Sequence, residues 1–356
     1  MSNEIWVLGG TGRTGKAVAT RLHRAGLSLA LIGRDRERLA GVAAELDGAP
    51  RLFVGSLDAA LAELAREAPA VLINTVGPFA STAARVARAC PPGTHYVDVA
   101  NELPAVQAIL ELDQQAKNAG QVLVAGAGFG VLASESVVLR LCEGRSPALR
   151  VRVDAVPSVA LEPGVIGSAL AGTILDGLPS GGRQVRDGRL ARARLSAEAM
   201  RLTTPDGDLV TTASLPSGEL LAAWHASRAD AVVCASSEVP TGAWVQLILP
   251  VASALLRLPA IARFAVRRLA QVPLKARARP RPHSWAHARV EWASGEVREG
   301  WLRAGDDAMT FTATAVAEVA QRLARGEGRP GAYTPGALFG PALAEAVGGE
   351  FFIEEG

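Results

Sequence analysis

The chain has 356 residues, of which 49% are hydrophobic and 20% are charged, and its formal net charge is +2. This length predicts two domains with a large buried core, and a charge so close to zero gives no argument for nucleic-acid binding. The three cysteines are far apart and lack metal-ligand spacing, so we expect core residues in a reducing compartment and no metal site. An apolar strand begins almost at once, which predicts a cytoplasmic protein without a signal peptide.

A glycine-rich turn follows the first apolar segment. The pattern of residues 5–8 predicts a buried strand, and residues 16–25 continue with a helical pattern. Between them, Gly10, Gly12 and Gly15 have the G-x-G-x-x-G spacing of dinucleotide-binding folds. In this motif the glycines permit a tight turn, a close approach of the backbone to a pyrophosphate, and close packing of the helix on the strand. Free N–H groups at the helix N-terminus would bind the pyrophosphate.

The end of the second predicted strand selects between NAD and NADP. An acid at this point binds the ribose 2′-hydroxyl of NAD, whereas an arginine accommodates the 2′-phosphate of NADP. Gly33 stands where the acid is expected and Arg34 follows it; a planar guanidinium suits phosphate. Asp35 is the alternative, NAD-type acid, but we favour it as the N-cap of a helix over residues 36–46. Arg38 either reaches the phosphate or faces solvent, and the sequence predicts NADPH as cofactor.

Strands and helices alternate as far as residue 125, which predicts a parallel, doubly wound sheet of the Rossmann type. The expected strands after the first are residues 27–32, 52–54, 70–75, 95–99 and 121–125. Helices are expected to lie between them, the last over residues 104–119, where Pro104 suits the first helical position.

The pattern changes after residue 126. Residues 149–156 alternate as a half-exposed strand, and short alternating segments between residues 183 and 236 predict a mostly antiparallel sheet. Helices are expected over residues 134–141, 168–176, 312–324 and 337–347, a hairpin over 285–303, a loop over 329–335 and a terminal strand over 351–353. We therefore predict an α/β protein with three parts: a Rossmann domain at 1–126, an α+β substrate domain at 127–310, and C-terminal helices at 311–356 that pack back on the Rossmann domain.

Residues 243–270 are strongly apolar, but prolines and arginines interrupt them. No run of about 18 apolar residues survives, so a transmembrane helix is rejected. Two broken amphipathic helices are expected instead, packed on the substrate sheet or lining an apolar pocket. The basic residues 267–281 allow either contact with an anionic membrane surface or a solvated proline-rich linker. Membrane contact over residues 243–281 is not favoured.

Seven landmarks, in order through nearly the whole chain, resemble the saccharopine dehydrogenase-like (saccharopine reductase-like) oxidoreductases. They are GGTGRTG at 9–15, GRDRERL at 33–39, NTVGPF at 74–79, HYVDVANE at 95–102, the glycine-phenylalanine loop at 126–130, TATAVAEVAQRLA at 312–324 and GAYTPGALFG at 331–340. The resemblance implies a Rossmann domain, an α+β substrate domain and NADPH-linked reduction. Members of this family include saccharopine reductases that act on imines and trans-acting enoyl reductases.

Two positions depart from the family's pattern where substrate should meet the nicotinamide. The family's loop after the sixth strand often carries an aspartate where this chain has Gly130. The family often has a glycine before the acid Glu102, and here Asn101 precedes it. No arginine clamp for a dicarboxylate amino acid stands out, and the apolar stretch at 243–270 favours a less polar substrate.

Ligands of open α/β sheets bind beyond the carboxyl ends of the strands. Asp98, Tyr96 and Glu102 are the candidate catalytic acids, and strand alternation puts the first two on one face. Asp98 lies nearer the crevice and is the better candidate; its alternative role is to fix the loop at Asn101. Glu102 also fits a first-turn helix acid. The expected cofactor contacts are Gly10, Thr11, Gly12, Arg13, Thr14, Gly33, Arg34, Asn74, Thr75, Val76, Gly77, Pro78 and Phe79.

The sequence therefore predicts an NADPH-dependent reductase of an imine C=N or enoyl C=C bond in a small, rather apolar substrate. The alternatives are a non-catalytic dinucleotide-binding scaffold or sensor, and a carbonyl reductase or dehydrogenase. The expected partner is a small molecule and not a nucleic acid. A homodimer is compatible with the sequence, which does not define an oligomeric state.

Overall fold

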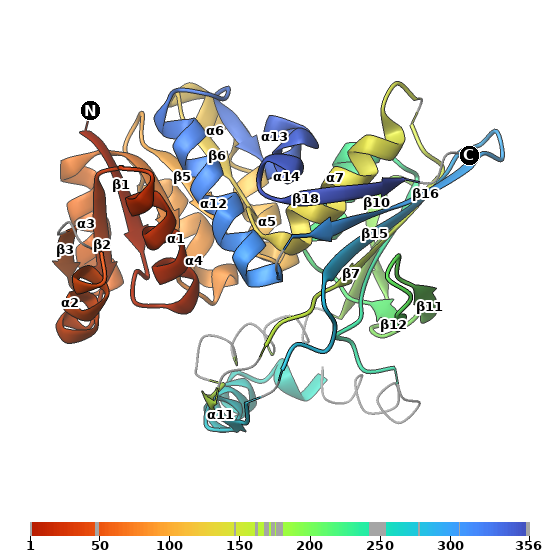
Figure 1. Cartoon of the computed structure of the whole chain (residues 1–356), viewed down its shortest axis with the longest axis horizontal. Helices are drawn as coiled ribbons and strands as arrows, with labels where there is room; N and C mark the ends of the chain where they lie inside the picture. The colour runs from red at the N-terminus through yellow and green to blue at the C-terminus, as the bar shows by residue number, and fades with distance from the viewer. Residues whose placement is uncertain are drawn as a thin grey trace.

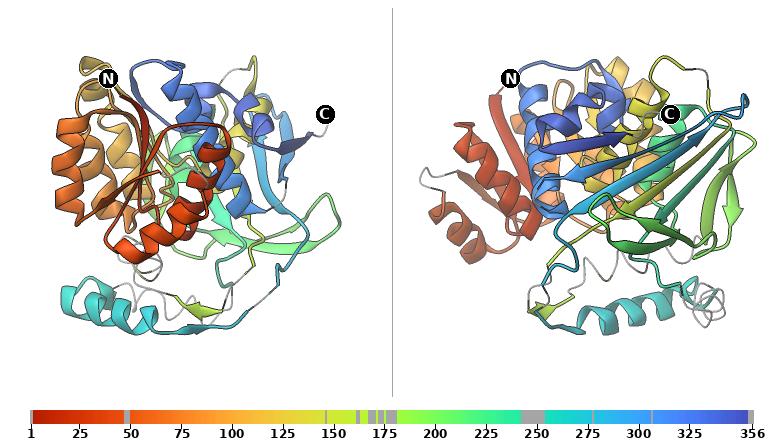
Figure 2. Two further views of the ribbon diagram at one scale, coloured as in Figure 1. Left: turned by 60° about the vertical axis from the view of Figure 1, so that its left-hand side comes forward. Right: turned by 45° about the vertical axis from the view of Figure 1, so that its right-hand side comes forward.

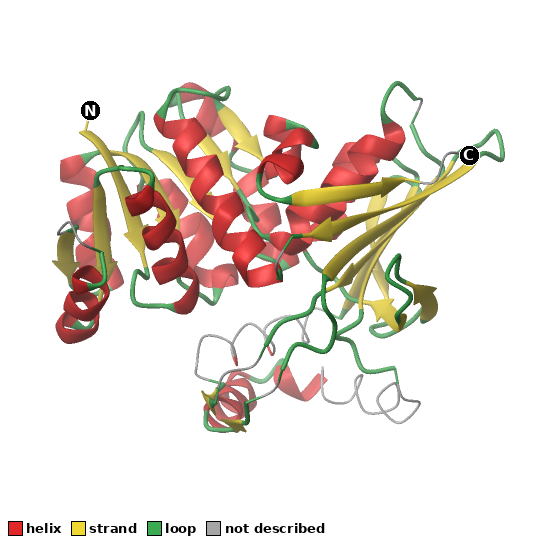
Figure 3. Cartoon of the chain, viewed as in Figure 1, coloured by secondary structure: helices red, strands yellow, loops and turns green. Residues whose placement is uncertain are grey.

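Two sheets lie side by side, with helices packed between and around them (Figure 1, Figure 3). The computed structural model describes residues 2–46, 50–145, 147–160, 163–166, 171, 175, 181–241, 254–276, 278–305 and 307–353. The helix expected over residues 168–176 and the first of the two helices expected within 243–270 lie almost wholly outside these described residues.

The first sheet has seven parallel strands in the order β17-β6-β5-β4-β1-β2-β3. Its strands are β1 (Ser2–Leu8), β2 (Leu29–Gly33), β3 (Arg51–Val54), β4 (Pro69–Asn74), β5 (His95–Asp98), β6 (Val122–Val124) and β17 (Gly331–Tyr333). The order of the first six strands is that of the Rossmann fold. The predicted parallel, doubly wound sheet is confirmed.

Helices connect these strands and cover both faces of the sheet (Figure 2). They are α1 (Arg13–Arg24), α2 (Arg36–Ala44), α3 (Leu57–Glu67), α4 (Phe79–Ala89), α5 (Leu103–Leu110) and α6 (Asp113–Asn118). The single helix expected over residues 104–119 is therefore two helices. The break falls at Leu112, whose ψ of 4° departs from helical geometry and whose side chain packs into the core.

The second sheet has nine strands, and its main path runs β10-β9-β13-β7-β15-β16-β18. Its strands are β7 (Arg150–Val156), β9 (Gly182–Arg186), β10 (Arg189–Ala193), β11 (Met200–Thr203), β12 (Leu209–Ser214), β13 (Ala231–Ser236), β15 (Ser284–Glu291), β16 (Val297–Ala304) and β18 (Gly349–Ile353). Among them β7 and β13 pair in parallel, and the other pairs are antiparallel. The mostly antiparallel second sheet and its hairpin β15–β16 are confirmed.

Helix α7 (Phe129–Cys142) joins the two sheets. Ten of its residues are buried, which is typical of a helix covered on all sides. It packs against α9 (Gly218–Ser227) and β15 on the side of the second sheet, and against α12 (Ala308–Ala324) on the side of the first. Because α7 begins directly after β6, the first loop of the second domain lies at the edge of the first sheet.

The C-terminal segment contributes to both sheets. Helix α12 packs on α1 and β4, and β17 extends the first sheet beyond β6, so the loop expected over residues 329–335 contains a strand. Helices α13 (Pro335–Phe339) and α14 (Ala342–Ala346) contact α7, and β18 pairs with β16. Glu135 of α7 fixes this segment, because its carboxyl accepts hydrogen bonds from the Thr334 hydroxyl and, at 2.8 Å, from the Gly336 amide. The exact domain boundaries stay predictions.

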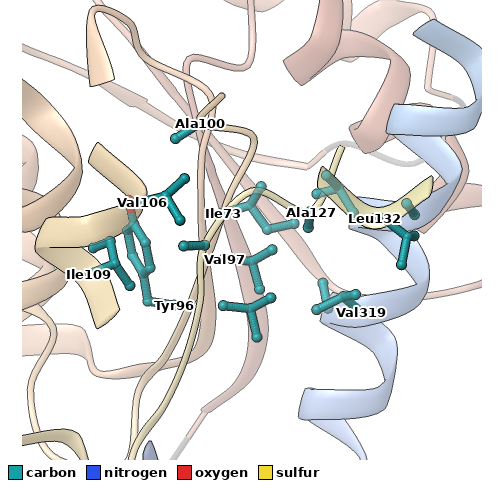
Figure 4. Close-up of a cluster of buried hydrophobic side chains, with 14 of the residues drawn as sticks. Ile73, Tyr96, Val97, Ala100, Val106, Ile109, Ala127, Leu132 and Val319 are labelled. Atoms are coloured by element: carbon teal, nitrogen blue, oxygen red, sulfur yellow. The ribbon is translucent and has the colours of Figure 1, made fainter. Parts of the chain in front are cut away.

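The core of the first domain fills both faces of β5. Tyr96 lies against Val106 and Ile109 of α5, whereas Val97 faces the side of α7 and α12, where Val319 lies (Figure 4). This alternation is the period of two that a strand imposes. Tyr96 and Asp98 consequently share the α5 side of the sheet, as the sequence predicts.

A smaller unit stands apart from both sheets. Helix α11 (Pro259–Ala270) lies beside the two-stranded pairing of β8 (Gly164–Val165) with β14 (Pro273–Leu274). No residue of α11 is buried, and the helix lies away from the body in each view (Figure 1, Figure 2). Among the residues that the structure describes, no helix is long and apolar enough to cross a membrane.

The contact between α12 and α7 should carry a measurable share of the stability. Phe311 is 2% exposed and meets Phe129 edge to face, with ring centroids 6.0 Å apart. Truncating a buried phenylalanine costs about 3–5 kcal/mol, so Phe311→Ala should clearly lower the midpoint of urea unfolding. Phe264→Ala removes a ring that is 60% exposed and should change stability by less than about 0.5 kcal/mol. Equal midpoints for the two variants would contradict this packing.

Candidate active site

The glycine turn between β1 and α1 forms the cradle that a pyrophosphate needs. Gly12 is the N-cap of α1 and offers no side-chain cap, so the first amides of the helix are left for a ligand. Gly9 has a φ of +88°, and a Cβ on Gly15 would lie 2.9 Å from the Gly9 carbonyl carbon. The turn thus depends on Gly9 as well as on the three motif glycines. Thr11 lies in this turn, and Arg13 and Thr14 are the first two residues of α1; their contact with the cofactor stays a prediction.

Arg34 lies directly after β2, where a 2′-phosphate is expected. Gly33 ends the strand, and Arg34 is exposed and has no hydrogen-bond or ion-pair partner among the described residues. The Asp35 carboxylate accepts a hydrogen bond from the Arg38 amide at 3.1 Å. Asp35 is therefore the N-cap of α2, as predicted, and its carboxylate is engaged. The local chemistry favours a phosphate over a ribose hydroxyl.

The end of β4 is fixed by its own polar side chains. The Asn74 side chain accepts from the Val76 amide at 3.0 Å and donates to the Tyr96 hydroxyl at 3.1 Å. The Thr75 hydroxyl donates to the Leu8 carbonyl at 2.8 Å, which ties the end of β4 to the end of β1. Residues 76–79 then turn into α4, whose N-cap is Pro78. The predicted contacts Val76, Gly77, Pro78 and Phe79 thus form one turn beside the glycine cradle.

Asp98 is buried completely and bonds to its own surroundings. Its Oδ1 accepts from the amides of Gly126 at 2.8 Å and Ala100 at 3.0 Å, and its Oδ2 accepts from the Tyr96 hydroxyl at 2.8 Å. Burial raises the pKa of Asp98 to about 6, although these three donors lower it in part, and it raises the pKa of Tyr96 well above its ordinary value. This geometry favours the structural role of Asp98, fixing the loops after β5 and β6, over direct proton transfer by Asp98 or Tyr96.

Glu102 connects two helix N-termini. It is the N-cap of α5, and its carboxylate accepts from the Phe79 amide at 3.4 Å at the start of α4 and from the Asn101 amide at 3.1 Å. A carboxylate at such a point is stabilised by the helix dipoles. The observed contacts fit the helix-acid alternative better than a catalytic role.

The strand order arranges these parts along one edge. The carboxyl ends of parallel strands lie together, so the order β2, β1, β4, β5, β6 places Arg34, the glycine turn, the residue 74–79 turn and the loops after β5 and β6 in sequence. A dinucleotide bound across this edge, with its 2′-phosphate at Arg34, would bring its nicotinamide end to the loops after β5 and β6.

A pocket of about 200 Å³ lies at that end of the edge, between the two sheets. Ala100, Asn101, Gly126 and residues 128–131 line it from the first sheet, and Met309 and Thr312 line it from α12. The second sheet contributes residues at the ends of β7 and β13, and α9 contributes Glu219. The two charged residues in this lining, Glu219 and Glu238, are both acidic.

Glu219 is the residue of this pocket that sequence reasoning missed. It lies in the first turn of α9 and is 3% exposed. Its Oε1 accepts from the Asn101 side chain at 3.4 Å, and its buried Oε2 has no hydrogen-bond partner in the described part of the chain. Burial raises the pKa of Glu219 above its ordinary value; hydrogen bonds from Ser217, the Glu219 amide and Asn101 lower it in part, and the nearby negative charge of Glu238 raises it.

Both departures from the family's pattern meet at this carboxyl. Any Cβ at position 130 would clash with Oε1 of Glu219, so Gly130 is required for the carboxyl to lie there. Asn101 supplies the hydrogen bond to the same oxygen. The start of α9 is held by the Gly218 amide, which donates to the Asn101 carbonyl at 2.8 Å. Recognising Glu219 from sequence would have required knowing that α9 reaches the loop after β5.

The other buried polar cluster is structural. His287 lies between Asp154 at 2.9 Å and Glu299 at 2.7 Å, and these contacts raise the pKa of His287 against the effect of burial. Arg152 completes the charge balance on Asp154. None of these residues lines the pocket. Among the described residues, no group of His, Cys, Asp or Glu could hold a metal ion.

Comparisons with known proteins agree with this geometry. Residues 5–124 match the family model described as the saccharopine dehydrogenase NADP binding domain. The apo, L-Glu-forming saccharopine dehydrogenase of Saccharomyces cerevisiae has a similar fold, with a TM-score of 0.61 and 13% identity over 99% of this chain and 100% of that one. No curated protein sequence matches.

Smaller matches cover about a third of the chain. The serine dehydrogenase of Escherichia coli has a TM-score of 0.31 and 16% identity over 34% of this chain and 80% of that one. A short-chain dehydrogenase of Sphingobium yanoikuyae in complex with NADPH has a TM-score of 0.29 and 20% identity over 34% and 70%.

The fold and the cofactor edge define an NADP-dependent oxidoreductase with a Rossmann domain. Its N-terminal domain belongs to the saccharopine dehydrogenase NADP-binding family, with NADP(H) as cofactor. The expected family, cofactor and enzyme class are confirmed, whereas the roles of individual site residues stay predictions.

Replacing Arg34 should change the choice of cofactor. Charge-assisted hydrogen bonds contribute about 1.5–3 kcal/mol, so Arg34→Ala should weaken NADPH binding about tenfold to a hundredfold. NADH binding should not change, because it lacks the 2′-phosphate. Arg88→Ala, at an exposed arginine of α4, is the matched control. Both affinities can be measured by nicotinamide fluorescence. An unaltered NADPH preference in Arg34→Ala would exclude Arg34 as the phosphate ligand.

Proposed function

We propose that this protein is an NADPH-dependent reductase that reduces a C=N or C=C bond in a small, rather apolar substrate bound in the pocket between the two sheets. The observation that carries the proposal is Glu219, a buried carboxyl at the nicotinamide end of the cofactor edge. Reduction of such a bond needs a hydride at one atom and a proton at the other. NADPH supplies the hydride when it is bound, and the chain must supply or admit the proton.

Glu219 is suited to hold that proton. Its pKa is raised mainly by burial, and its buried Oε2 has no hydrogen-bond partner among the described residues. A buried acid with a raised pKa is a common form of general acid in enzymes. In the proposed step the carbon of the double bond accepts the hydride, and the nitrogen or the second carbon takes the proton from Glu219. Solvent then restores the proton to the carboxylate.

The charge of the pocket favours the C=N version of this reaction. Glu219 and Glu238 are both acidic, and no lysine or arginine of the described part of the chain lines the pocket. The negative charge of Glu238, and that of Glu219 once it has given up its proton, stabilises a protonated imine, whereas a developing enolate needs donors or positive charge. The charge of Glu238 also disfavours a dicarboxylate substrate, which would bring further negative charge into the pocket. An imine with apolar substituents fits the lining best.

The pH dependence of turnover tests the role of Glu219. The protonated form is the active one, so the wild-type rate should fall as pH rises through its raised pKa. Glu219→Gln keeps the size of the side chain but has no proton to give, so kcat should fall about 10²- to 10⁴-fold and the alkaline fall should disappear. NADPH affinity, measured by fluorescence, should stay unchanged. If this variant kept wild-type rates across the pH range, Glu219 would be excluded as the proton donor.

Glu238→Gln is the matched pocket variant. Its negative charge raises the pKa of Glu219, so neutralising it should lower that pKa. The alkaline fall in rate should then move to lower pH, while a large part of kcat remains. An unshifted profile would show that the two carboxyls do not interact.

A substrate panel tests the proposed reaction itself. Purified protein with NADPH is offered preformed cyclic imines, aldehyde–amine pairs, enoyl thioesters and simple ketones, and NADPH consumption is followed by absorbance. We expect consumption with apolar imines first. Turnover of ketones alone would favour a carbonyl reductase. Tight NADPH binding with no turnover of any member would favour the non-catalytic scaffold or sensor.

A further inference from the structure

The unit around α11 stands out by its exposure. We call it the α11 arm and define it as residues 254–276 together with residues 163–166, which carry β14 and β8. A 12-residue helix with no buried residue gains little from tertiary packing. The arm also lies away from both sheets in every view (Figure 2). Packing in the hydrophobic core therefore does not explain the sequence of the arm.

The arm is basic without compensation. Residues 254–276 contain five lysines or arginines and no aspartate or glutamate, and residues 163–166 contain neither kind of charge. In α11, Arg263, Arg267 and Arg268 are exposed and follow one another at helical spacing, so they form one outward stripe. The formal net charge of all 356 residues is only +2. The excess of positive charge in the arm is therefore a local feature and not a consequence of overall composition.

The same arm exposes large apolar side chains. Nine large hydrophobic residues of the described chain are exposed, and five of them lie here: Val165, Leu255, Leu258, Phe264 and Val272. Phe264 is 60% exposed and lies within the arginine stripe, with the Arg268 guanidinium 5.4 Å from its ring centroid. Exposed apolar side chains that lie together and are rimmed by polar or charged residues are typical of a surface that binds a partner.

We propose that the α11 arm docks on an anionic lipid surface. Arginines at a helix surface are attracted to acidic headgroups, and apolar side chains between them enter the boundary of the acyl chains. Val165, Leu255 and Phe264 lie in different elements of the arm, which suits contact with a plane better than a fit to one groove. A nucleic acid would use the cations but would gain little from exposed leucines and valines.

Docking of the arm would bring the site to the lipid surface. The arm begins beside the pocket. The chain enters the arm twice, after Pro157 and again after Glu238, and both of these residues line the pocket. Two hydrogen bonds hold together the segments that join the arm to the rest of the chain. The Ser158 hydroxyl donates to the Arg281 carbonyl at 2.6 Å, and the Arg281 guanidinium donates to the Pro157 carbonyl at 2.8 Å. The docking proposal is independent of the reaction proposed above.

Vesicle co-sedimentation of the full chain tests docking directly. We expect binding to phosphatidylcholine vesicles that contain phosphatidylglycerol, weak binding to pure phosphatidylcholine, and loss of binding as salt is raised. The variant Arg263→Glu, Arg267→Glu, Arg268→Glu should bind about a hundredfold more weakly or worse, because each basic residue near an anionic surface contributes substantially. Phe264→Ser should weaken binding several-fold at unchanged charge.

Controls separate docking from general charge attraction. The variant Arg24→Glu, Arg88→Glu, Arg201→Glu changes three exposed arginines outside the arm by the same charge and should keep most of the binding. Circular dichroism and NADPH affinity should match wild type in both triple variants. The proposal is overturned if no anionic vesicle is bound, or if both triple variants lose binding equally. It is also overturned if a single-stranded RNA competes with equal affinity and Phe264→Ser has no effect, or if the exposed arm instead mediates self-association in gel filtration.

Discussion

The buried carboxyl of Asp98 is the interaction on which the site depends. Its three hydrogen bonds fix the loop after β5 through Ala100, the loop after β6 through Gly126, and Tyr96 on the strand itself. Backbone amides in a water-free interior must find acceptors, so these two loops can meet only where such an acceptor is provided. With a pKa of about 6, Asp98 is largely ionised at neutral pH and can serve all three donors. The loops that form one wall of the pocket are therefore held in place by this single carboxyl group.

The second domain supplies a carboxyl group to the space between the loops of the first domain. Gly130 and Asn101 together make room for, and bind, a carboxyl that arrives from α9. A family pattern with an aspartate at position 130 would supply its acid from the loop; this chain leaves that space to Glu219. The proposed proton donor is thus positioned by contacts from both sheets. This arrangement explains how two apparent losses in sequence can coexist with an intact cofactor edge.

The elements with strong local signals could be predicted from sequence. The glycine turn, the alternation of strands and helices through β6, the Asp35 cap and the β15–β16 hairpin each depend on residues close together in the chain. The misses depend on distant partners. Strand β17 is three residues long and exists through pairing with β6. The sequence around Glu219 does not distinguish it from other glutamates, because its place in the pocket depends on the packing of α9 against the loop at Asn101. For Asp98 the sequence leaves a catalytic and a loop-fixing role open; the burial and hydrogen bonds that favour the second role are properties of the assembled core.

A crystal structure of the NADPH complex would test the central claim most directly. The account predicts the 2′-phosphate at Arg34, the pyrophosphate on the first amides of α1, and the nicotinamide ring beside residues 126–130 with the Glu219 carboxyl facing the pocket on the ring's open side. A nicotinamide bound away from this pocket, or a Glu219 carboxyl separated from it by protein, would contradict the account.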